Sequence, residues 1–211
     1  MPILYLVRHG ETEDNARLVF QGQSGKGLNR RGRAQAERLA ARMKRARPSA
    51  IVSSDLERAV ETAAFVGEAC GIVPTSDPEL REVDVGAWTG RSHDEIAAAF
   101  PEEWAAWSSG LDVRRGGGET YAELAARIER AVLRIASTAG RDPVVIVSHG
   151  GSIKSYVAKV LGVGPDGLRA LAGVGNAGLT IVEIDAKGRV RLHAWNDTAH
   201  LEGLLVEENT D

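Results

Sequence analysis

Cysteine is nearly absent from this 211-residue chain, which contains only Cys70. One cysteine excludes an intramolecular disulfide framework. Aromatic residues make up 5% of the chain, and no apolar run approaches the roughly 18 residues that a membrane span requires. The first ten residues also lack the basic segment of a secretory signal. We therefore expect a soluble, cytoplasmic protein with no membrane partner.

Basic charge is not in excess either. The chain has 26 Lys and Arg against 29 Asp and Glu, and its formal charge is −3. Proteins that bind nucleic acid usually carry a basic stripe or patch. We therefore expect no nucleic-acid partner, and any anion must bind at a local site. A chain of this length, 43% hydrophobic, can bury a conventional core, so we expect a single domain over residues 1–211.

Three short apolar runs each end in polar residues. The runs cover residues 3–7, 50–52 and 144–147, and the segments between them space their apolar residues by three or four. Such spacing predicts amphipathic helices between buried strands. Repeated strand and helix indicate the α/β class, a three-layer α/β/α sandwich with a largely parallel central sheet.

Other segments depart from this alternation. Residues 179–184 and 190–195 alternate apolar with polar residues around a short turn, which predicts an antiparallel hairpin at the sheet edge and is compatible with a homodimer. Residues from about 85 to 118 are rich in Trp, Ala, Ser and Gly, and we expect them to form an inserted helical cap. From about Glu202 onward we expect a frayed acidic tail.

Polar side chains gather where the predicted strands end. Arg8 and His9 follow the first run, His149 follows the last, and Arg58 lies about one turn into the helix predicted after the second. Ligands of open α/β sheets bind at this edge. Two histidines suggest a metal, but neighbouring guanidinium groups would repel Zn²⁺. Guanidinium matches phosphate oxygens, so we expect a phosphoryl pocket without a metal.

A neutral histidine in such a pocket can accept the phosphoryl group as a covalent phosphohistidine. A carboxyl group would then protonate the leaving oxygen and later activate water. Residues 80–86 offer two candidates, Glu82 and Asp84. From its position alone, each histidine would more readily be a structural residue, and Arg58 a member of a surface ion pair.

Longer motifs support the catalytic interpretation. Five blocks follow one another along the chain: residues 6–12 (Leu-Val-Arg-His-Gly-Glu-Thr) with Asn15 and Gln21-Gly22-Gln23, residues 53–59, residues 80–82 with 86–90, residues 117–120, and residues 147–151. In sequence and order they resemble the histidine phosphatase superfamily, the phosphoglycerate-mutase-like fold. Arg-His-Gly alone is a weak motif, whereas five ordered blocks are specific.

The resemblance implies roles for particular residues. It makes His9 the nucleophile and Glu82, rather than Asp84, the general acid and base, and it implies neither a metal nor an organic cofactor. The residues that it places around the phosphate and the rest of the substrate are Arg8, Asn15, Gln21, Gly22, Gln23, Arg58, His149 and Gly150. Asn15 could instead make only local hydrogen bonds, and Gln23 could serve as turn filler.

The superfamily contains phosphatases and mutases. In cofactor-dependent mutases Gly-Asn typically follows the second histidine, a tyrosine lies three residues after the acid, and paired arginines follow a tryptophan of the cap. This chain has Gly151, Val85 and Ser108 there. We therefore expect a metal-independent phosphomonoester hydrolase for a small phosphorylated metabolite. The alternatives are a phosphoglycerate mutase primed by 2,3-bisphosphoglycerate and a binding protein without turnover.

Two features leave the substrate open. Many members have Asp where this chain has Gly25, in the loop 24–27. Arg114 and Arg115 could reach a substrate carboxylate or phosphate, or form a solvated pair of charges. We expect Trp88, Trp104 and Trp107 to pack in the core of the cap.

Overall fold

A six-stranded mixed sheet forms the centre of the protein, with the strand order β3-β2-β4-β1-β5-β6. The computed structural model describes residues 1–204, without the side chains at 165 and 166, so the expected tail lies outside the described residues from 205 on. β3, β2, β4 and β1 are parallel, whereas β5 is antiparallel to β1 and β6 to β5. The strands are β1 (Ile3–Arg8), β2 (Ala50–Ser53), β3 (Thr75–Ser76), β4 (Val144–Ser148), β5 (Leu179–Ile184) and β6 (Val190–Asp197).

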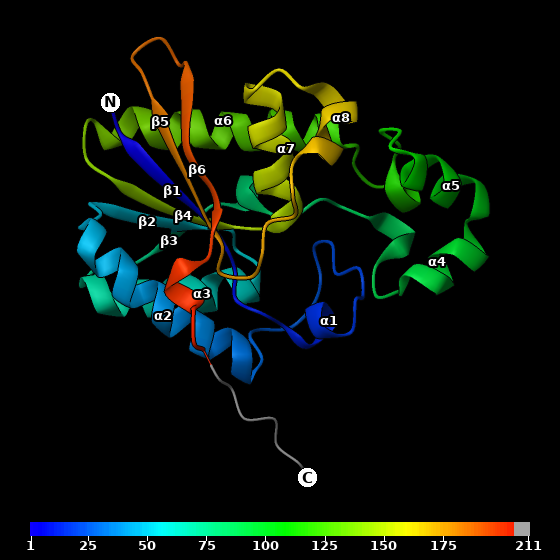
Figure 1. Ribbon diagram of the computed structural model, residues 1–211, viewed down its shortest axis with the longest axis horizontal. Helices are drawn as coiled ribbons and strands as arrows, with labels where there is room; N and C mark the ends of the chain where they lie inside the picture. The colour runs from blue at the N-terminus through cyan, green and yellow to red at the C-terminus, as the bar shows by residue number, and fades with distance from the viewer. Residues whose placement is uncertain (205–211) are drawn as a thin grey trace.

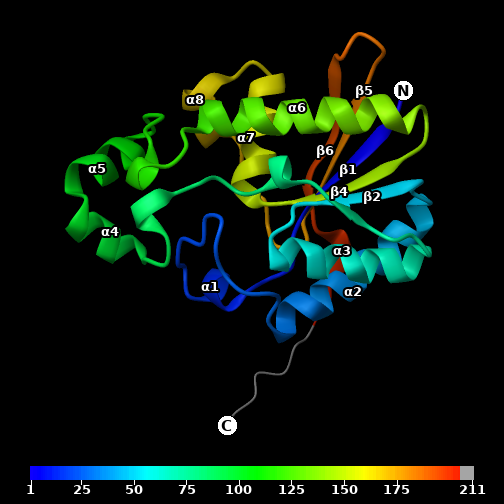
Figure 2. The same ribbon diagram turned by 180° about the vertical axis from the view of Figure 1, so that it is seen from behind.

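Helices cover both faces of this sheet. α6 and α7 lie on one face and α2 and α3 on the other (Figures 1 and 2). The predicted α/β class, the mainly parallel sheet and the antiparallel edge hairpin are thus confirmed. The α-helices are α1 (Glu13–Ala16), α2 (Arg30–Ala46), α3 (Glu57–Cys70), α4 (His93–Ala99), α5 (Pro101–Ser109), α6 (Tyr121–Ala139), α7 (Gly150–Val160) and α8 (Gly164–Gly167).

The central strand β4 shows why the fold has three layers. Its five residues are all buried, as is typical of a parallel strand covered on both faces. Val144 and Ile146 pack in the core with α6 and α7, whereas Val145 and Val147 pack in the core with α2 and α3. Successive side chains of a strand point to opposite faces, so one apolar run supplies both cores.

A hydroxyl residue followed three positions later by Glu, as in residues 92–95 and 120–123, predicts a helix start, and the structure confirms both starts. Ser92 and Thr120 form capping boxes with Glu95 and Glu123 at the starts of α4 and α6. In each box a hydroxyl and a carboxylate satisfy backbone N–H groups that have no partner within the helix. Short 3-10 turns cover Pro78–Leu80, Gly86–Trp88, Arg115–Gly117, Leu168–Ala170 and Ala199–Leu201.

α4 and α5 lie to one side of the sheet, near α1 and α8 (Figure 1). Trp88 is fully buried there, with its ring 6.0 Å from that of Trp104 and 5.8 Å from that of Trp107. Phe20 contacts Trp88 edge-on. These aromatic contacts anchor α5 to the 3-10 turn that carries Trp88. No helix among residues 1–204 is long and apolar enough to cross a membrane.

Candidate active site

The two histidines predicted to act together are neighbours in space. His9 follows the last residue of β1, His149 follows the last residue of β4, and Arg8 pairs with Ser148 across these parallel strands. The imidazole centroids are 5.1 Å apart, and the ring planes are inclined at 60°. Strand register therefore brings together residues that are 140 positions apart in the sequence.

His9 presents an unprotonated nitrogen. Its Nδ1 lies 2.7 Å from the carbonyl oxygen of Gly10, and a carbonyl can only accept, so the hydrogen-bond network assigns the proton to Nδ1. Nε2 accepts a hydrogen bond from Nε of Arg58 at 3.2 Å. Desolvation above all, and then the charges of Arg8 and Arg58, lower the pKa of His9 well below its usual value. His9 is therefore neutral at neutral pH.

Arg58 ties the helix α3 to the loop that follows α1. Its Nη2 donates to the carbonyl of Gly22 at 2.7 Å, and its Nη1 donates to the carbonyl of Ser24. The side chain is only 2% exposed, and burial lowers its pKa to about 10. Gly22 has φ +52°, and a Cβ there would lie 2.7 Å from Val85. Glycine at this position thus allows the loop to close over the guanidinium group.

Several buried polar atoms lack a hydrogen-bond partner within the described part of the chain. Four of these atoms belong to residues predicted for the site: Nε of Arg8, Oε1 of Gln21 and both ring nitrogens of His149. Desolvation, followed by the charge of Arg58, lowers the pKa of His149 well below its usual value. Such groups are nearly always paired in proteins. Two positive groups and two unpaired imidazole nitrogens in one place suit a ligand that is anionic and accepts hydrogen bonds.

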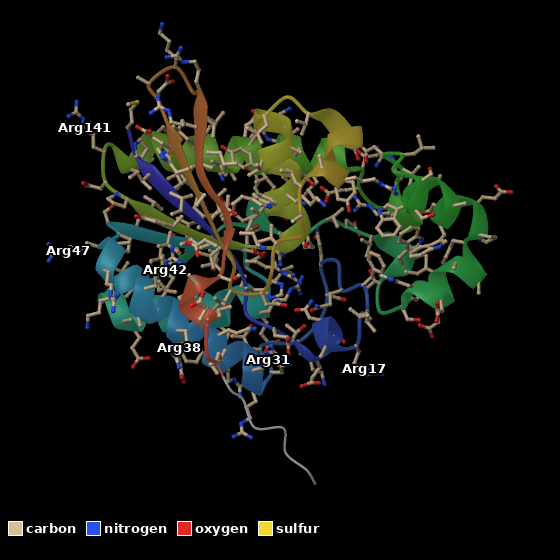
Figure 3. The ribbon with its side chains drawn as sticks, viewed as in Figure 1. Arg17, Arg31, Arg38, Arg42, Arg47 and Arg141 are labelled. Carbon is tan, nitrogen blue, oxygen red and sulfur yellow. The ribbon has the colours of Figure 1, made fainter. Side chains whose placement is uncertain are left out.

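One terminal nitrogen of the Arg8 guanidinium group is held by the backbone. Nη1 of Arg8 donates to the carbonyl of Val174 at 2.7 Å, and Gly150 packs closely against the guanidinium group. Desolvation lowers the pKa of Arg8, although Glu82 and Glu11 oppose that effect. By contrast, Arg47 and Arg141 extend outward from the surface (Figure 3).

Glu82 lies at the N-terminus of α7. Its Oε2 accepts from the backbone N–H of Gly151 at 3.0 Å, and its Oε1 accepts from the N–H of Ser152 at 3.0 Å. Asp84 is exposed and accepts from the N–H of Gly86 in a tight turn. Of the two candidate carboxylates, only Glu82 therefore lies at the N-terminus of α7, the helix that follows His149 in the chain.

Asn15 and Gln23, two further residues predicted for the site, bond to different parts of the chain. Oδ1 of Asn15 accepts from the N–H of Thr12 in a capping box and from Nδ2 of Asn176. Nε2 of Gln23 donates to the carbonyl of Glu82 at 3.2 Å. Asn15 thus makes the local bonds considered for it, and Gln23 joins the loop after α1 to the segment that carries Glu82.

Two residues that sequence reasoning missed support the site. Nδ2 of Asn176 donates to the carbonyl of His9 as well as to Asn15. Arg127, on α6, donates to both carboxylate oxygens of Glu119 and to the backbone carbonyls of three residues around the acid, Glu79, Arg81 and Glu82. Neither lies in a recognisable motif, because each acts through contacts that are distant in sequence.

Arg114 and Arg115 do not form a solvated pair. Arg114 is exposed, bonds to the carbonyl of Gly118 and pairs with Glu123. Arg115 is 1% exposed, and its guanidinium carbon lies 3.8 Å from the centroid of the Tyr121 ring. Among residues 1–204, no group of three His, Cys, Asp or Glu side chains could hold a metal ion.

Comparisons with known proteins show the family of this chain. The model of the histidine phosphatase superfamily (branch 1) matches residues 4–198, and the chain belongs to this family of enzymes. A glucosyl-3-phosphoglycerate phosphatase of Mycolicibacterium vanbaalenii is 37% identical, with 94% of this chain and 96% of that protein covered. A probable phosphoglycerate mutase of Proteus mirabilis is 34% identical, with 97% of each covered.

A solved structure is similar over nearly its whole length. It is that of a mycobacterial glucosyl-3-phosphoglycerate phosphatase with VO3, which is 36% identical to this chain. The TM-score is 0.85, and the match covers 93% of this chain and 99% of that one.

Proposed function

We propose that this enzyme hydrolyses a phosphate monoester of a small metabolite through a phosphohistidine at Nε2 of His9. The observation that carries the proposal is the hydrogen bond from Nδ1 of His9 to the carbonyl of Gly10, 2.7 Å long. It leaves the lone pair of Nε2 in the pocket beside Arg58 and His149. A neutral imidazole in this orientation is a competent nucleophile toward phosphorus.

In the first step the hydrogen bond from Nε of Arg58 to Nε2 of His9 breaks, the lone pair of Nε2 attacks phosphorus, the N–P bond forms and the ester P–O bond breaks. The leaving oxygen takes a proton from the carboxyl group of Glu82. In the second step Glu82 accepts a proton from water, whose oxygen attacks phosphorus, and the N–P bond breaks to release phosphate. Arg8, Arg58 and His149 donate to the phosphoryl oxygens and stabilise their charge.

The loop after α1 and the start of α7 bind the rest of the substrate in this proposal. Gln21, whose buried Oε1 has no partner in the described chain, is the side chain with spare hydrogen-bonding capacity. Gln23 and Gly22 position the loop around Arg58 and Glu82. Gly150 keeps the helix start close to Arg8, and the amide of Asn15 contributes on the phosphate side.

Hydrolysis is favoured over phosphoryl transfer to a second substrate oxygen. A mutase must hold its product and exclude water while the phosphohistidine survives. The three positions that depart from mutases offer no anchor for that purpose: Gly151 has no side chain, Val85 is 1% exposed in the core, and the hydroxyl of Ser108 bonds to a carbonyl within α5. Because phosphatase relatives named for glucosyl-3-phosphoglycerate are 36–37% identical, this ester is the first substrate to test.

The test measures phosphate release from a panel of monoesters in the presence of EDTA. The panel includes glucosyl-3-phosphoglycerate, and 3-phosphoglycerate with and without 2,3-bisphosphoglycerate. We expect phosphate release that persists with the chelator and needs no primer. Primer-dependent 2-phosphoglycerate without phosphate release would establish a mutase, and ester binding without either product would establish a binding protein.

Two variants test the residue roles. His9→Ala should reduce turnover by at least about 10³-fold, whereas His193→Ala, at an exposed position of β6, should retain activity. Glu82→Gln should accumulate phosphorylated protein if its second step is the slower one. Full activity of His9→Ala would refute the nucleophile assignment.

A further inference from the structure

The hydroxyl group of Ser152 lies between two acceptors in the segment that carries the candidate acid. Ser152 belongs to the first turn of α7 and is fully buried. Its Oγ is 2.9 Å from the carbonyl oxygen of Arg81 and 3.2 Å from Oε1 of Glu82. A serine hydroxyl has only one proton to donate, so it serves one of these acceptors at a time. A buried donor with two alternative acceptors therefore lies beside the acid.

The two carboxylate oxygens of Glu82 differ in the donors that they accept. Oε1 accepts the backbone N–H of Val83 at 2.9 Å and that of Ser152 at 3.0 Å. Within residues 1–204, Oε2 accepts one hydrogen bond, from the N–H of Gly151 at 3.0 Å. Each carboxylate oxygen has two lone pairs, so the backbone alone occupies Oε1, whereas Oε2 keeps one lone pair free. A proton that Glu82 gives or takes therefore belongs on Oε2.

Neither acceptor loses its last donor when the hydroxyl turns to the other one. When the hydroxyl donates to Arg81, Oε1 of Glu82 keeps its two backbone donors. When it donates to Glu82, the carbonyl of Arg81 keeps Nη1 of Arg127 as a donor at 2.9 Å. Arg127 reaches this carbonyl from α6, which lies on the same face of the sheet as α7 (Figures 1 and 2). A buried acceptor without a donor is costly, so this arrangement lets the hydroxyl change acceptors at little cost.

The charge of Glu82 determines which acceptor is the stronger one. In the proposed reaction Glu82 alternates between the protonated acid and the carboxylate. A hydrogen bond to an ionised acceptor is about twice as strong as one to a neutral acceptor. The carboxylate therefore attracts the hydroxyl away from the carbonyl of Arg81, whereas the protonated acid leaves the shorter contact with that carbonyl favoured.

We propose that Ser152 is a positioning residue whose hydroxyl donates to Oε1 of ionised Glu82 and to the carbonyl of Arg81 when Glu82 is protonated, so that Oε2 exchanges the proton. The inference rests on the proposed function and deepens it by naming the reacting oxygen. In the first step the O–H bond at Oε2 breaks, the leaving oxygen takes the proton, and the hydroxyl turns to Oε1. In the second step water returns a proton to Oε2 and the hydroxyl turns back. Ser152 keeps its own proton throughout.

The pH profile of kcat/KM tests this role. Ser152→Ala removes the hydroxyl and leaves the backbone donors to Glu82 in place, so the carboxylate loses a charged hydrogen bond and Glu82 should keep its proton to higher pH. Phosphorylation of His9 needs that proton. We therefore expect the decline of kcat/KM at high pH to occur about one pH unit higher in Ser152→Ala than in the wild type. Both proteins are measured with the same ester, so that titration of the substrate is common to them.

Ser155→Ala is the matched control. Ser155 lies on the same helix and is 2% exposed, but its hydroxyl donates to the carbonyl of Gly151 at 2.7 Å and not to Glu82. This variant should keep the wild-type pH profile, and Ser152→Thr, which keeps a hydroxyl at position 152, should restore most of it. Equal shifts in Ser152→Ala and Ser155→Ala would show a general effect of loosening α7 and would overturn the specific role of Ser152.

A direct titration of Glu82 separates this inference from the proposed function. In protein labelled with ¹³C-glutamate, the side-chain carboxyl resonance of Glu82 is the one that Glu82→Gln lacks. Without substrate, its titration midpoint should lie about one pH unit higher in Ser152→Ala than in the wild type, and should not move in Ser155→Ala. An unchanged midpoint in Ser152→Ala would overturn the role of Ser152, whatever the enzyme hydrolyses. A raised midpoint without phosphate release would support that role and contradict the proposed function.

Discussion

The carboxylate of Glu82 is held directly by the backbone N–H of Gly151, with 3.0 Å between Oε2 and the amide nitrogen. A Cβ atom at position 151 would lie 2.6 Å from Oε1 of Glu82, closer than nonbonded atoms normally approach. Any larger residue at position 151 would therefore force the carboxylate of Glu82 to shift. Gly151 is also one of the three positions at which the sequence departs from the mutases. The same residue contacts the candidate acid, Glu82.

Adding a single methyl group tests this relationship. Gly151→Ala should displace the Glu82 carboxylate and lower kcat for phosphate release about 10²-fold, because a misplaced acid loses much of its effect. Gly173→Ala is the control, since a Cβ at that exposed glycine would contact nothing within 4 Å. Unchanged turnover in Gly151→Ala would show that the contact does not position the acid.

The second prediction concerns Arg127, which holds the segment before the acid. Arg127→Met removes the side-chain donor to the Glu79 carbonyl, one of two donors to each of the Arg81 and Glu82 carbonyls, and the ion pair with Glu119. We expect the free energy of unfolding to fall by about 2–3 kcal/mol and kcat to fall about tenfold. Arg130→Met, which removes an exposed partner of Glu79, should change stability by less than about 1 kcal/mol. Urea unfolding and turnover measurements compare the two variants.

The third prediction concerns the shape of Arg58 rather than its charge. Lysine keeps the charge but cannot donate at once to His9, Gly22 and Ser24, as the guanidinium group does. Arg58→Lys should therefore raise KM at least about tenfold and speed hydrogen exchange in residues 22–25. Arg38→Lys, at an exposed position of α2, should change neither. Slow exchange retained in Arg58→Lys would show that the loop does not depend on the guanidinium group.

The fourth prediction follows from the lowered pKa values of His9 and His149. Below pH of about 6.5 the unfolded chain protonates both residues, whereas the folded protein keeps them neutral. Unfolding therefore takes up protons, and stability should decrease as pH falls from 6.5 toward the folded pKa values. The slope should approach about 1.4 kcal/mol per pH unit for each histidine.

Urea unfolding between pH 7.5 and 5.5, above the range in which most carboxylates titrate, measures this slope. His149→Asn should reduce the slope by the contribution of one proton, about 1.4 kcal/mol per pH unit. Adding His9→Asn should reduce the slope by the same amount again. A slope in the wild type near zero over this range would mean that neither imidazole is held neutral by the fold.

Local patterns in the sequence determined much of the architecture. The apolar run of residues 144–147 became the fully buried strand β4, and the Ser92 and Thr120 signals became capping boxes at helix starts. These predictions succeeded because strand periodicity and capping depend on residues within one turn or one strand of each other. The strand ends also indicated that His9, Arg58 and His149 would meet.

The contacts that orient these residues could not be predicted from local sequence patterns. Val174 binds Arg8, Asn176 binds the carbonyl of His9, and Arg127 holds the carbonyl of Glu82. Each partner is 45 or more positions away in the sequence, and an isolated Asn or Arg carries no signal of its partner. Arg115 likewise had no local feature to indicate that it would be buried against Tyr121.

The sequence by itself therefore determined the elements, their order and the residues that we propose carry the chemistry, because these follow from short-range periodicity and from motifs. Only the tertiary structure decided which nitrogen of His9 is free, where Glu82 rests, and that the hydroxyl of Ser152 lies between Arg81 and Glu82. Those properties depend on hydrogen bonds and packing between segments that are far apart along the chain, and no local pattern encodes such distances.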